Sequence, residues 1–287
     1  MTLPSLLIDE IANRAVDRKL PDGSPYRSLS LMDSLQLARR YDLMGWEVEI
    51  GALENGVVPE RYARNLHMMS PEDQVQLLQS RVSVIGLGGL GGAVTEILAR
   101  IGIGRLSLFD ADHFEDSNLN RQFLSNLDEV GSPKAEAAAA RVGRINPSVE
   151  VHAAKVLVGR ENAEALLRNS DGIVDCLDNI QTRFVIEDAA RRLGCPLVSA
   201  AVAGASGHLT TVFPSDPGLV SVFGPRDAAA EKGSEASLGC LPQAVTFLAT
   251  LECSEIIKIL LGRGALLRGK LLTADLMDNT FEILRLQ

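Results

Sequence analysis

The glycine-rich segment GLGGLGG at residues 86–92 restricts the possible folds more than any other feature of this chain. It follows an apolar run at residues 82–85 and precedes a helical pattern at residues 93–101. A strand, a glycine turn and a helix in this order form the context in which a GxGxxG motif binds phosphate. We expect four glycines to let the backbone approach a phosphate at the helix N-terminus: Gly86, Gly88, Gly89 and Gly91.

Short apolar strand patterns alternate with helical patterns from residue 82 to about residue 200. This alternation is typical of βαβ units and a parallel sheet. Three later patterns, HLTTVF, KLLTAD and FEILRL, are spaced like antiparallel strands. We therefore predict an α/β fold with a Rossmann-like mixed β-sheet flanked by helices, parallel in its first half and antiparallel in its second. The segment between Pro242 and Gly262 reads as a buried helix.

Residues 1–57 differ in character from the rest of the chain. They carry two short helical patterns, at residues 31–41 and 45–56, and contain nine acidic and six basic residues. This acidic excess argues against a DNA-reading helix-turn-helix. We predict a helical N-terminal extension over residues 1–57, used for packing or dimerisation, and a second domain over residues 58–287.

Charge and composition exclude several classes of protein. The net charge of -9 argues against a nucleic-acid partner, because phosphate binding needs clustered basic residues. No apolar stretch approaches the roughly 20 residues of a membrane helix, and the N-terminus lacks the pattern of a signal peptide. The four cysteines form no CxxC pair. We expect a cytoplasmic enzyme without a membrane partner.

An acidic residue follows the glycine turn at the distance expected of a nucleotide site. Asp110 closes the second strand pattern, 24 residues after Gly86. A carboxylate about this far along accepts hydrogen bonds from ribose hydroxyls. The glycines and Asp110 would serve NAD and ATP equally.

The residues that follow favour a triphosphate. Asn118, Arg121 and Gln122 lie in SNLNRQF, and Lys134 follows thirteen residues after Arg121. Two fixed cations near the turn suit a triphosphate better than the pyrophosphate of a dinucleotide.

Two acidic residues end the pattern DGIVDCLDN. A carboxylate beside a triphosphate is a natural ligand of Mg²⁺, and Asp178, nearest the carboxyl end of the strand, is our candidate. Asp175 could equally cap the following helix. Arg183, five residues after Asp178, reads as a structural ion-pair partner.

Five ordered motifs, GLGGLG, FDAD, NLNRQF, the lysine of VGSPK and DCLDN, resemble those of the E1-like activating-enzyme superfamily, in the ThiF/MoeB/HesA branch. The resemblance covers roughly residues 58–287 and implies a ThiF/MoeB-like ATP-binding adenylation domain there. RYARN at residues 61–65 is similar to the family's arginine finger, with Arg64 at the matching position. Such a finger is supplied across a dimer interface, which implies a homodimer.

The resemblance also implies a reaction. The C-terminal glycine carboxylate of a ubiquitin-like sulfur carrier protein ending in Gly-Gly, of the thiamine or molybdopterin type, attacks the α-phosphate of ATP and releases pyrophosphate. A carboxylate is already ionised at pH 7, so catalysis needs positioning and charge neutralisation rather than a general base. The residues expected to supply these are Arg64, Arg121, Lys134 and a Mg²⁺ held by Asp178.

The chain departs from the family's pattern in two places. Gly218 and Ser221 stand where many relatives carry a zinc-binding CxxC, and the chain ends at Gln287 before a second CxxC would occur, so we expect no zinc site. Glu235 stands where some relatives have a reactive cysteine. Cys240 lies close by, but we interpret it as a small buried residue at a helix start. We therefore predict adenylation only.

Three alternatives remain open at this point. A branch of the same superfamily acts on a modified tRNA base, although the acidity of this chain argues against it. An NAD-dependent oxidoreductase needs only the glycine turn and Asp110. A binding protein that has lost catalysis would use residues 1–57 as its interaction module.

Overall fold

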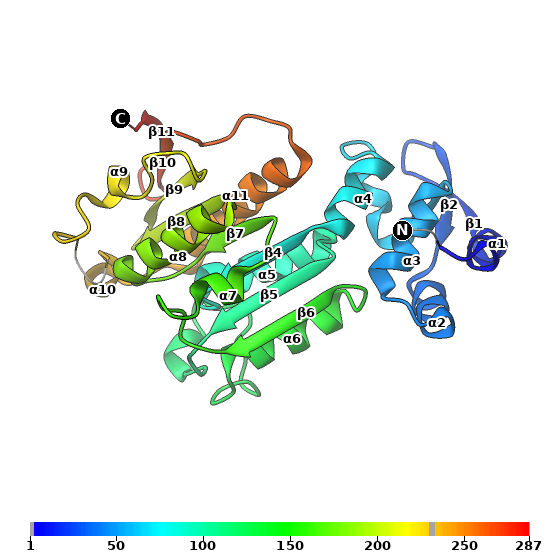
Figure 1. The fold of residues 1–287 in the computed structure, drawn as a ribbon, viewed down its shortest axis with the longest axis horizontal. Helices are drawn as coiled ribbons and strands as arrows, with labels where there is room; N and C mark the ends of the chain where they lie inside the picture. The colour runs from blue at the N-terminus through cyan, green and yellow to red at the C-terminus, as the bar shows by residue number, and fades with distance from the viewer. Residues whose placement is uncertain (1–2, 230–232, 287) are drawn as a thin grey trace.

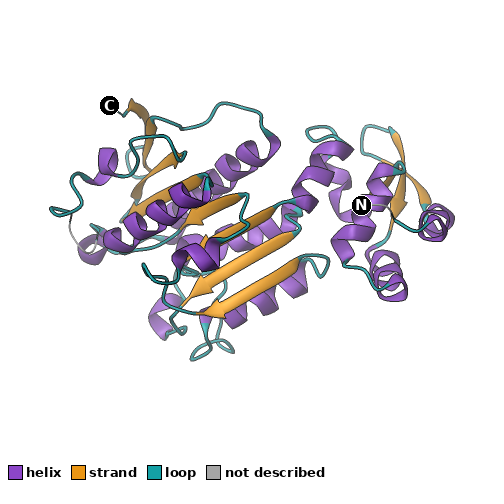
Figure 2. Ribbon diagram, in the orientation of Figure 1, coloured by secondary structure: helices purple, strands orange, loops and turns teal. Residues whose placement is uncertain are grey.

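A computed structural model describes residues 3–229 and 233–286 of the chain. It contains an eight-stranded sheet in the order β11-β10-β9-β8-β7-β4-β5-β6, with helices on both faces (Figures 1 and 2). A smaller N-terminal unit lies beside α4, at the end of the molecule away from α10 (Figure 1). The predicted fold class is confirmed.

The sheet changes from parallel to antiparallel at β8, as the sequence predicts. Neighbouring strands run parallel from β8 to β6 and antiparallel from β8 to β11. The parallel strands are β4 (Arg81–Ile85), β5 (Arg105–Asp110), β6 (Glu150–Lys155), β7 (Gly172–Asp175) and β8 (Leu197–Ala203). The antiparallel strands are β9 (Ser206–Val212), β10 (Lys270–Asp275) and β11 (Thr280–Arg285).

Each face of the sheet has its own layer of helices and its own core. The first layer consists of α5 (Gly89–Ile101), α6 (Lys134–Ile145) and α11 (Pro242–Leu261), and the second contains α7 (Ala163–Leu167) and α8 (Ile180–Leu193). Successive residues of β4 point to opposite faces, so Val84 packs against the first layer and Ile85 against the second. Two short helices, α9 (Val220–Phe223) and α10 (Glu235–Leu238), lie in the long segment before α11.

Helix α11 has the boundaries that the sequence predicts. Pro242 occupies its first turn, and Gly262 ends it with φ 62°, a left-handed conformation that glycine adopts without strain. Among the described residues, no helix combines the length and the apolarity needed to cross a lipid bilayer.

The N-terminal unit contains strands as well as helices. Its elements are α1 (Ser5–Arg14), β1 (Val16–Lys19), β2 (Pro25–Leu29), α2 (Leu31–Tyr41), α3 (Gly45–Glu54) and β3 (Val57–Pro59), and the three strands form a separate sheet. It leads into a 3₁₀ helix, η1 (Glu60–Asn65), and α4 (Pro71–Gln79). The sequence analysis identified the patterns of α2 and α3 but no strand, because the four exposed residues of β1 show no apolar alternation. The extension is thus not purely helical, and β3 spans the predicted boundary at residue 57.

Candidate active site

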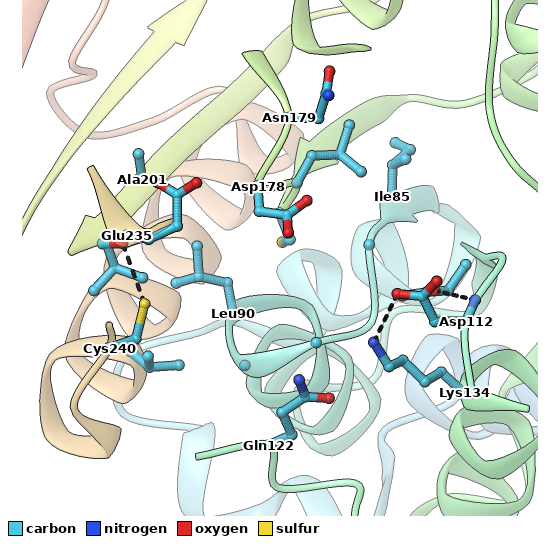
Figure 3. A pocket seen from close by; sticks show the side chains of 18 of the residues that line it. Ile85, Leu90, Asp112, Gln122, Lys134, Asp178, Asn179, Ala201, Glu235 and Cys240 are labelled. Atoms are coloured by element: carbon cyan, nitrogen blue, oxygen red, sulfur yellow. Dashed lines mark hydrogen bonds and ion pairs between the residues drawn. The ribbon is translucent and has the colours of Figure 1, made fainter. Parts of the chain in front are cut away.

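A pocket of about 780 Å³ lies where the carboxyl ends of β4, β5 and β7 meet (Figure 3). Pockets at this edge are the usual ligand sites of open α/β sheets. Eight of the eleven residues predicted to form the nucleotide site line it: Gly86, Gly88, Gly89, Asp110, Arg121, Gln122, Lys134 and Asp178. Three others, Gly91, Asn118 and Arg64, do not.

The glycine turn that joins β4 to α5 is tightly packed. Gly86 has φ 85°, and a side chain at Gly91 would overlap the carbonyl oxygen of Gly86. Gly91 therefore shapes the turn from behind rather than lining the pocket. On the other side, the backbone N–H of Leu87 donates a hydrogen bond to Asp110 Oδ2 at 2.6 Å. Asp110, at the end of β5, thus holds the turn in place.

Helix α5 presents an uncapped N-terminus to the pocket. Its N-cap residue is Gly88, which offers no side-chain acceptor to the first N–H groups of the helix. The free N–H groups and the helix dipole favour an anion at this end. The turn therefore offers a phosphate-sized anion backbone donors and a partial positive charge.

Two basic side chains face the same pocket from different elements. Lys134 begins α6, and its Nζ lies 3.1 Å from Asp112 Oδ2. Its side chain is only 9% exposed, whereas that of Asp112 is 71% exposed. Arg121 donates from Nη1 to Ser117 O and Asn120 Oδ1, both at 2.9 Å, and forms no ion pair with a carboxylate of the described chain. The sequence analysis missed Asp112, although it is the second acid of the FDAD motif.

The segment after β5 holds two amide side chains in different roles. Asn118, in the short helix η2 (Asp116–Asn118), accepts a hydrogen bond from Glu115 N at 3.1 Å and lies behind the pocket. The backbone carbonyl oxygen of Asn118 accepts hydrogen bonds from the backbone N–H groups of Arg121 and Gln122, so Asn118 shapes the loop that carries them. Gln122 is buried against Gly88, and its Oε1 has no hydrogen-bond partner among the described residues. A buried acceptor of this kind is expected to have a partner in the functional state.

The two carboxylates of DGIVDCLDN have separate functions in the structure. Asp175 is fully buried and forms an ion pair with Arg183 Nη1 at 3.0 Å, while Ser199 Oγ donates to it at 2.7 Å. Arg183 is therefore a structural ion-pair partner, as predicted. Asp178 points into the middle of the pocket and makes no hydrogen bond or ion pair with any residue of the described ranges (Figure 3).

Glu235 and Cys240 line the far side of the pocket. Cys240 is half-buried rather than buried as expected, and its Sγ lies 3.4 Å from Val202 O. Burial raises the pKa of its thiol, Arg121 lowers it, and Glu235 and Asp178 raise it further, with a net rise. The thiol is therefore largely protonated at neutral pH, which disfavours it as a nucleophile.

Arg64 lies at the opposite edge of the sheet from the pocket. It belongs to η1, where Tyr62 accepts a hydrogen bond from Asn146 Nδ2 at 3.1 Å, just after the last residue of α6. Tyr62 also lies against Gly102, which follows α5 and precedes β5. Since β5 runs from this edge to Asp110, the two edges are separated by the length of a six-residue strand, about 20 Å. Arg64 does not line the pocket of its own chain.

The positions discussed for zinc do not form part of this pocket. Gly218 packs against Glu187 of α8, and Ser221 lies in α9. In the described ranges, no three or more His, Cys, Asp or Glu side chains are arranged to hold a metal ion by themselves.

Sequence comparison places the chain among a known group of proteins. A family model described as the ThiF family matches residues 62–287. The chain is 40% identical over 231 residues to the SAMP-activating enzyme E1 of Haloferax volcanii, covering 78% of this chain and 83% of the relative. It is 37% identical over 235 residues to the sulfur carrier protein adenylyltransferase of Thermus thermophilus, covering 77% and 85%.

Solved structures share the fold at lower identity. The crystal structure of E. coli MccB with ATP matches with a TM-score of 0.69 and 18% identity, over 98% of this chain and 87% of that one. The E. coli tRNA N6-threonylcarbamoyladenosine dehydratase TcdA, in complex with AMP, matches with a TM-score of 0.60 and 21% identity, over 71% and 95%. Both likenesses are of the fold.

The packing of the glycine turn yields a stability prediction. Gly91→Ala should lower the free energy of unfolding by about 3 kcal/mol, because the added methyl group forces the turn apart. The matched control is Gly143→Ala, at an exposed position of α6, where nothing lies within 4 Å of the new methyl group. That variant should gain about 0.5–1 kcal/mol from helix propensity. Urea denaturation followed by circular dichroism measures both, and equal stability of the two variants would contradict the prediction.

Proposed function

The chain belongs to the ThiF family, and from this premise we propose that it adenylates the C-terminal glycine carboxylate of a ubiquitin-like sulfur carrier protein. The reaction uses ATP and releases pyrophosphate, and the carrier is of the thiamine or molybdopterin type, ending in Gly-Gly. The ThiF/MoeB/HesA resemblance is confirmed by the family match. The expected enzyme class, an adenylyltransferase, agrees with the name of the Thermus relative.

One arrangement carries the proposal: an uncapped helix N-terminus, two basic side chains and an unpaired carboxylate surround the same space. The N–H groups of α5 with Arg121 and Lys134 suit the phosphates of ATP. A dinucleotide would need the turn and Asp110 but not the two cations. The arrangement therefore favours ATP over NAD as the nucleotide.

The pocket offers further groups to a nucleotide. Gln122 lies beside the glycine turn, and its orphaned Oε1 requires a donor, which a hydroxyl or amino group of the nucleotide would supply and an ionised phosphate would not. Asp110 already accepts hydrogen bonds from Leu87 N and Asp112 N, so it holds the turn, and its remaining acceptor capacity is available for a ribose hydroxyl.

The residues fit a Mg²⁺ ion bound together with ATP. Asp110, Asp112, Asp178 and Glu235 line the pocket, and a polyphosphate among them needs a counter-cation. Mg²⁺ is bound by one or two carboxylates together with substrate phosphates and water, so the single unpaired carboxylate of Asp178 is sufficient. When bound, the ion neutralises charge on the phosphates.

A second hollow gives the carrier's tail a route to the nucleotide. It measures about 630 Å³ and shares Asp178 and Leu238 with the first pocket. From there it extends to Thr273 on β10 and Glu282 on β11. We expect an extended Gly-Gly tail, which has no side chains, to lie along this hollow. The tail's carboxylate would arrive beside Asp178.

The chemistry needs little from the protein beyond orientation and charge. One oxygen of the terminal carboxylate forms a bond to the α-phosphorus, and the bond from the α-phosphorus to the bridging oxygen breaks. The electron pair leaves with pyrophosphate, and no proton is transferred. Arg121 and Lys134 stabilise the negative charge that moves onto the leaving phosphates.

We place Arg64 in the site of a second subunit. It lies at the edge of the sheet opposite to its own pocket, so it contributes only by reaching the pocket of a partner in a homodimer. A symmetric dimer would then complete both sites with two equivalent arginines. The raised pKa of Cys240 and the glutamate at position 235 limit the proposal to adenylate formation.

The overall acidity favours a protein substrate over tRNA. A tRNA-modifying enzyme needs a basic face to bind phosphates, and the net charge of this chain is -9. The similarity to the tRNA dehydratase is a similarity of fold, and it does not indicate a tRNA substrate.

Lys134→Ala should lower carrier-dependent exchange of labelled pyrophosphate into ATP by about 100-fold, because a charge beside the phosphates is lost. The matched control is Lys19→Ala, on exposed β1, which should retain the wild-type rate. The assay contains ATP, Mg²⁺ and each Gly-Gly carrier encoded in the same genome. Absence of exchange with every carrier would overturn the proposed function, and full exchange by Lys134→Ala would overturn the role of the lysine.

Asp178→Asn should raise the Mg²⁺ concentration needed for half-maximal exchange by about tenfold or more, since the metal loses a charged ligand. Asp128→Asn, at an exposed position outside the pocket, serves as the control and should leave this concentration unchanged. Removal of the metal with EDTA should abolish exchange in the wild-type protein. An unchanged Mg²⁺ requirement in Asp178→Asn would contradict the assignment.

Arg64→Ala should also lower exchange by about 100-fold, although Arg64 lies far from the pocket of its own chain. Mixing it with Lys134→Ala should restore about a quarter of the wild-type rate, because half of the dimers are then mixed and each has one intact site. Subunits are mixed under conditions that allow exchange between dimers, and sedimentation checks the dimeric state. No recovery in the mixture would show that Arg64 does not act across the interface.

A further inference from the structure

Helix η1, which carries Arg64, is too short to hold its own geometry. It is a six-residue 3₁₀ helix, and such helices have strained hydrogen bonds and rarely persist alone. Its conformation must therefore come from contacts with neighbouring elements. The described contacts come mainly from the N-terminal unit.

The first residue of η1 is held by β2 of the N-terminal unit. Tyr26 OH donates to Glu60 Oε2 at 3.0 Å, and Ser28 Oγ donates to the same oxygen. Burial and the hydrogen bond to Glu60 raise the pKa of Tyr26, so its phenol remains a neutral donor. These bonds attach the start of η1 to the three-stranded sheet.

The next two residues of η1 are held by a buried carboxylate on α3. Glu49 is fully buried, Tyr62 OH donates to its Oε2 at 3.0 Å, and Arg61 Nε lies 3.8 Å from its Oε1. Ser148 Oγ, on the segment between α6 and β6, donates to Glu49 Oε1 at 2.6 Å. A side chain at Gly45 would collide with Ser148, so the approach of α3 to this segment is close. The N-terminal unit, η1 and the α/β unit thus share one buried polar network.

Arg64 differs from its neighbours in η1. Its side chain is exposed and makes no hydrogen bond or ion pair with any residue in the described ranges. By contrast, each of three residues before it makes a hydrogen bond or an ion pair with the N-terminal unit: Glu60, Arg61 and Tyr62. A guanidinium presented on a fixed support, with its own hydrogen-bonding capacity unused, is suited to bind an anion on another molecule.

We infer that the N-terminal unit is the positioning device for Arg64. Tyr26 and Ser28, through Glu60, and Glu49, through Arg61 and Tyr62, fix η1 so that Arg64 is presented to the nucleotide pocket of a second copy of the chain. The inference rests on the proposed function and deepens it, because it assigns a task to residues 3–59. Tyr26 and Glu49 are positioning residues and touch no substrate.

The placement of Arg64 matters because reactions of bound phosphates are sensitive to small shifts of a charged group. A displacement of about 1 Å can reduce the rate by 10²-fold. Loss of one of the bonds that hold Glu60 should let η1 move without unfolding the protein, since Tyr26 is only half-buried. If the N-terminal unit served only for packing, substitutions in it would change the stability of the protein. They would not change the rate of pyrophosphate exchange by the protein that remains folded.

Tyr26→Phe tests the inference, with Tyr41→Phe as the matched control. Tyr41 OH donates to Glu10 at 2.8 Å, so the control removes the same kind of bond within the same unit without a contact to η1. In the full-length wild-type background, Tyr26→Phe should lower pyrophosphate exchange about tenfold, whereas Tyr41→Phe should retain the wild-type rate. Thermal unfolding of both variants verifies that they are folded at the assay temperature.

A double-mutant cycle separates positioning from a general structural effect. If Tyr26 acts through Arg64, then Tyr26→Phe should cause no further loss in the Arg64→Ala background. An equal loss in both backgrounds, or wild-type exchange by Tyr26→Phe, would overturn this inference and leave the proposed function intact. Absence of exchange in the wild-type protein with every carrier would overturn the proposed function and this inference together.

Discussion

The close contact between Gly91 and the carbonyl of Gly86 is the constraint on which the rest of the structure depends. It lets α5 begin four residues after the last residue of β4, so the helix axis points its first N–H groups at the edge of the sheet. The carboxylate of Asp110 holds the same turn from the neighbouring strand. Because β4 is central in the parallel half of the sheet, every other pocket residue is placed relative to this turn.

The charged side chains around the glycine turn fall into two groups. Some stabilise the fold, and others are available to a ligand. The Asp175–Arg183 pair is buried, and both side chains make further hydrogen bonds, to Ser199 and to the carbonyl oxygen of Ala200, which makes the pair a structural feature next to the pocket. Asp178, three residues further along, has no such partner within the described ranges and faces the open space. The same short motif therefore supplies one carboxylate to the fold and, in the proposed function, one to a ligand. This division explains why two acids at the end of one strand are not redundant.

In the proposed dimer, Arg64 supplies a further charge to the site of the partner subunit. Arg64 stands on η1, between the N-terminal unit and the amino edge of the sheet. The buried Glu49 links the elements at that junction, because it receives hydrogen bonds from η1 and from the segment before β6. In the proposed dimer, the N-terminal unit of one chain would therefore influence catalysis in the other. A small unit remote from the pocket can in this way matter to the reaction.

Sequence patterns alone determined the order of strands and helices from β4 onward, the change of strand direction at β8, and eight of the eleven predicted site residues that line the pocket. These features follow from local periodicity, from glycines in a fixed spacing and from the rule that parallel strands end at a common edge. Only the tertiary structure placed Gly91 and Asn118 behind the pocket, paired Lys134 with Asp112, and put Arg64 at the opposite edge. The strands of the N-terminal sheet were also missed, since β1 is exposed and has no apolar alternation. The physical reason is that residue patterns report local conformation and burial, whereas the distance between remote side chains is decided by how the packed elements meet.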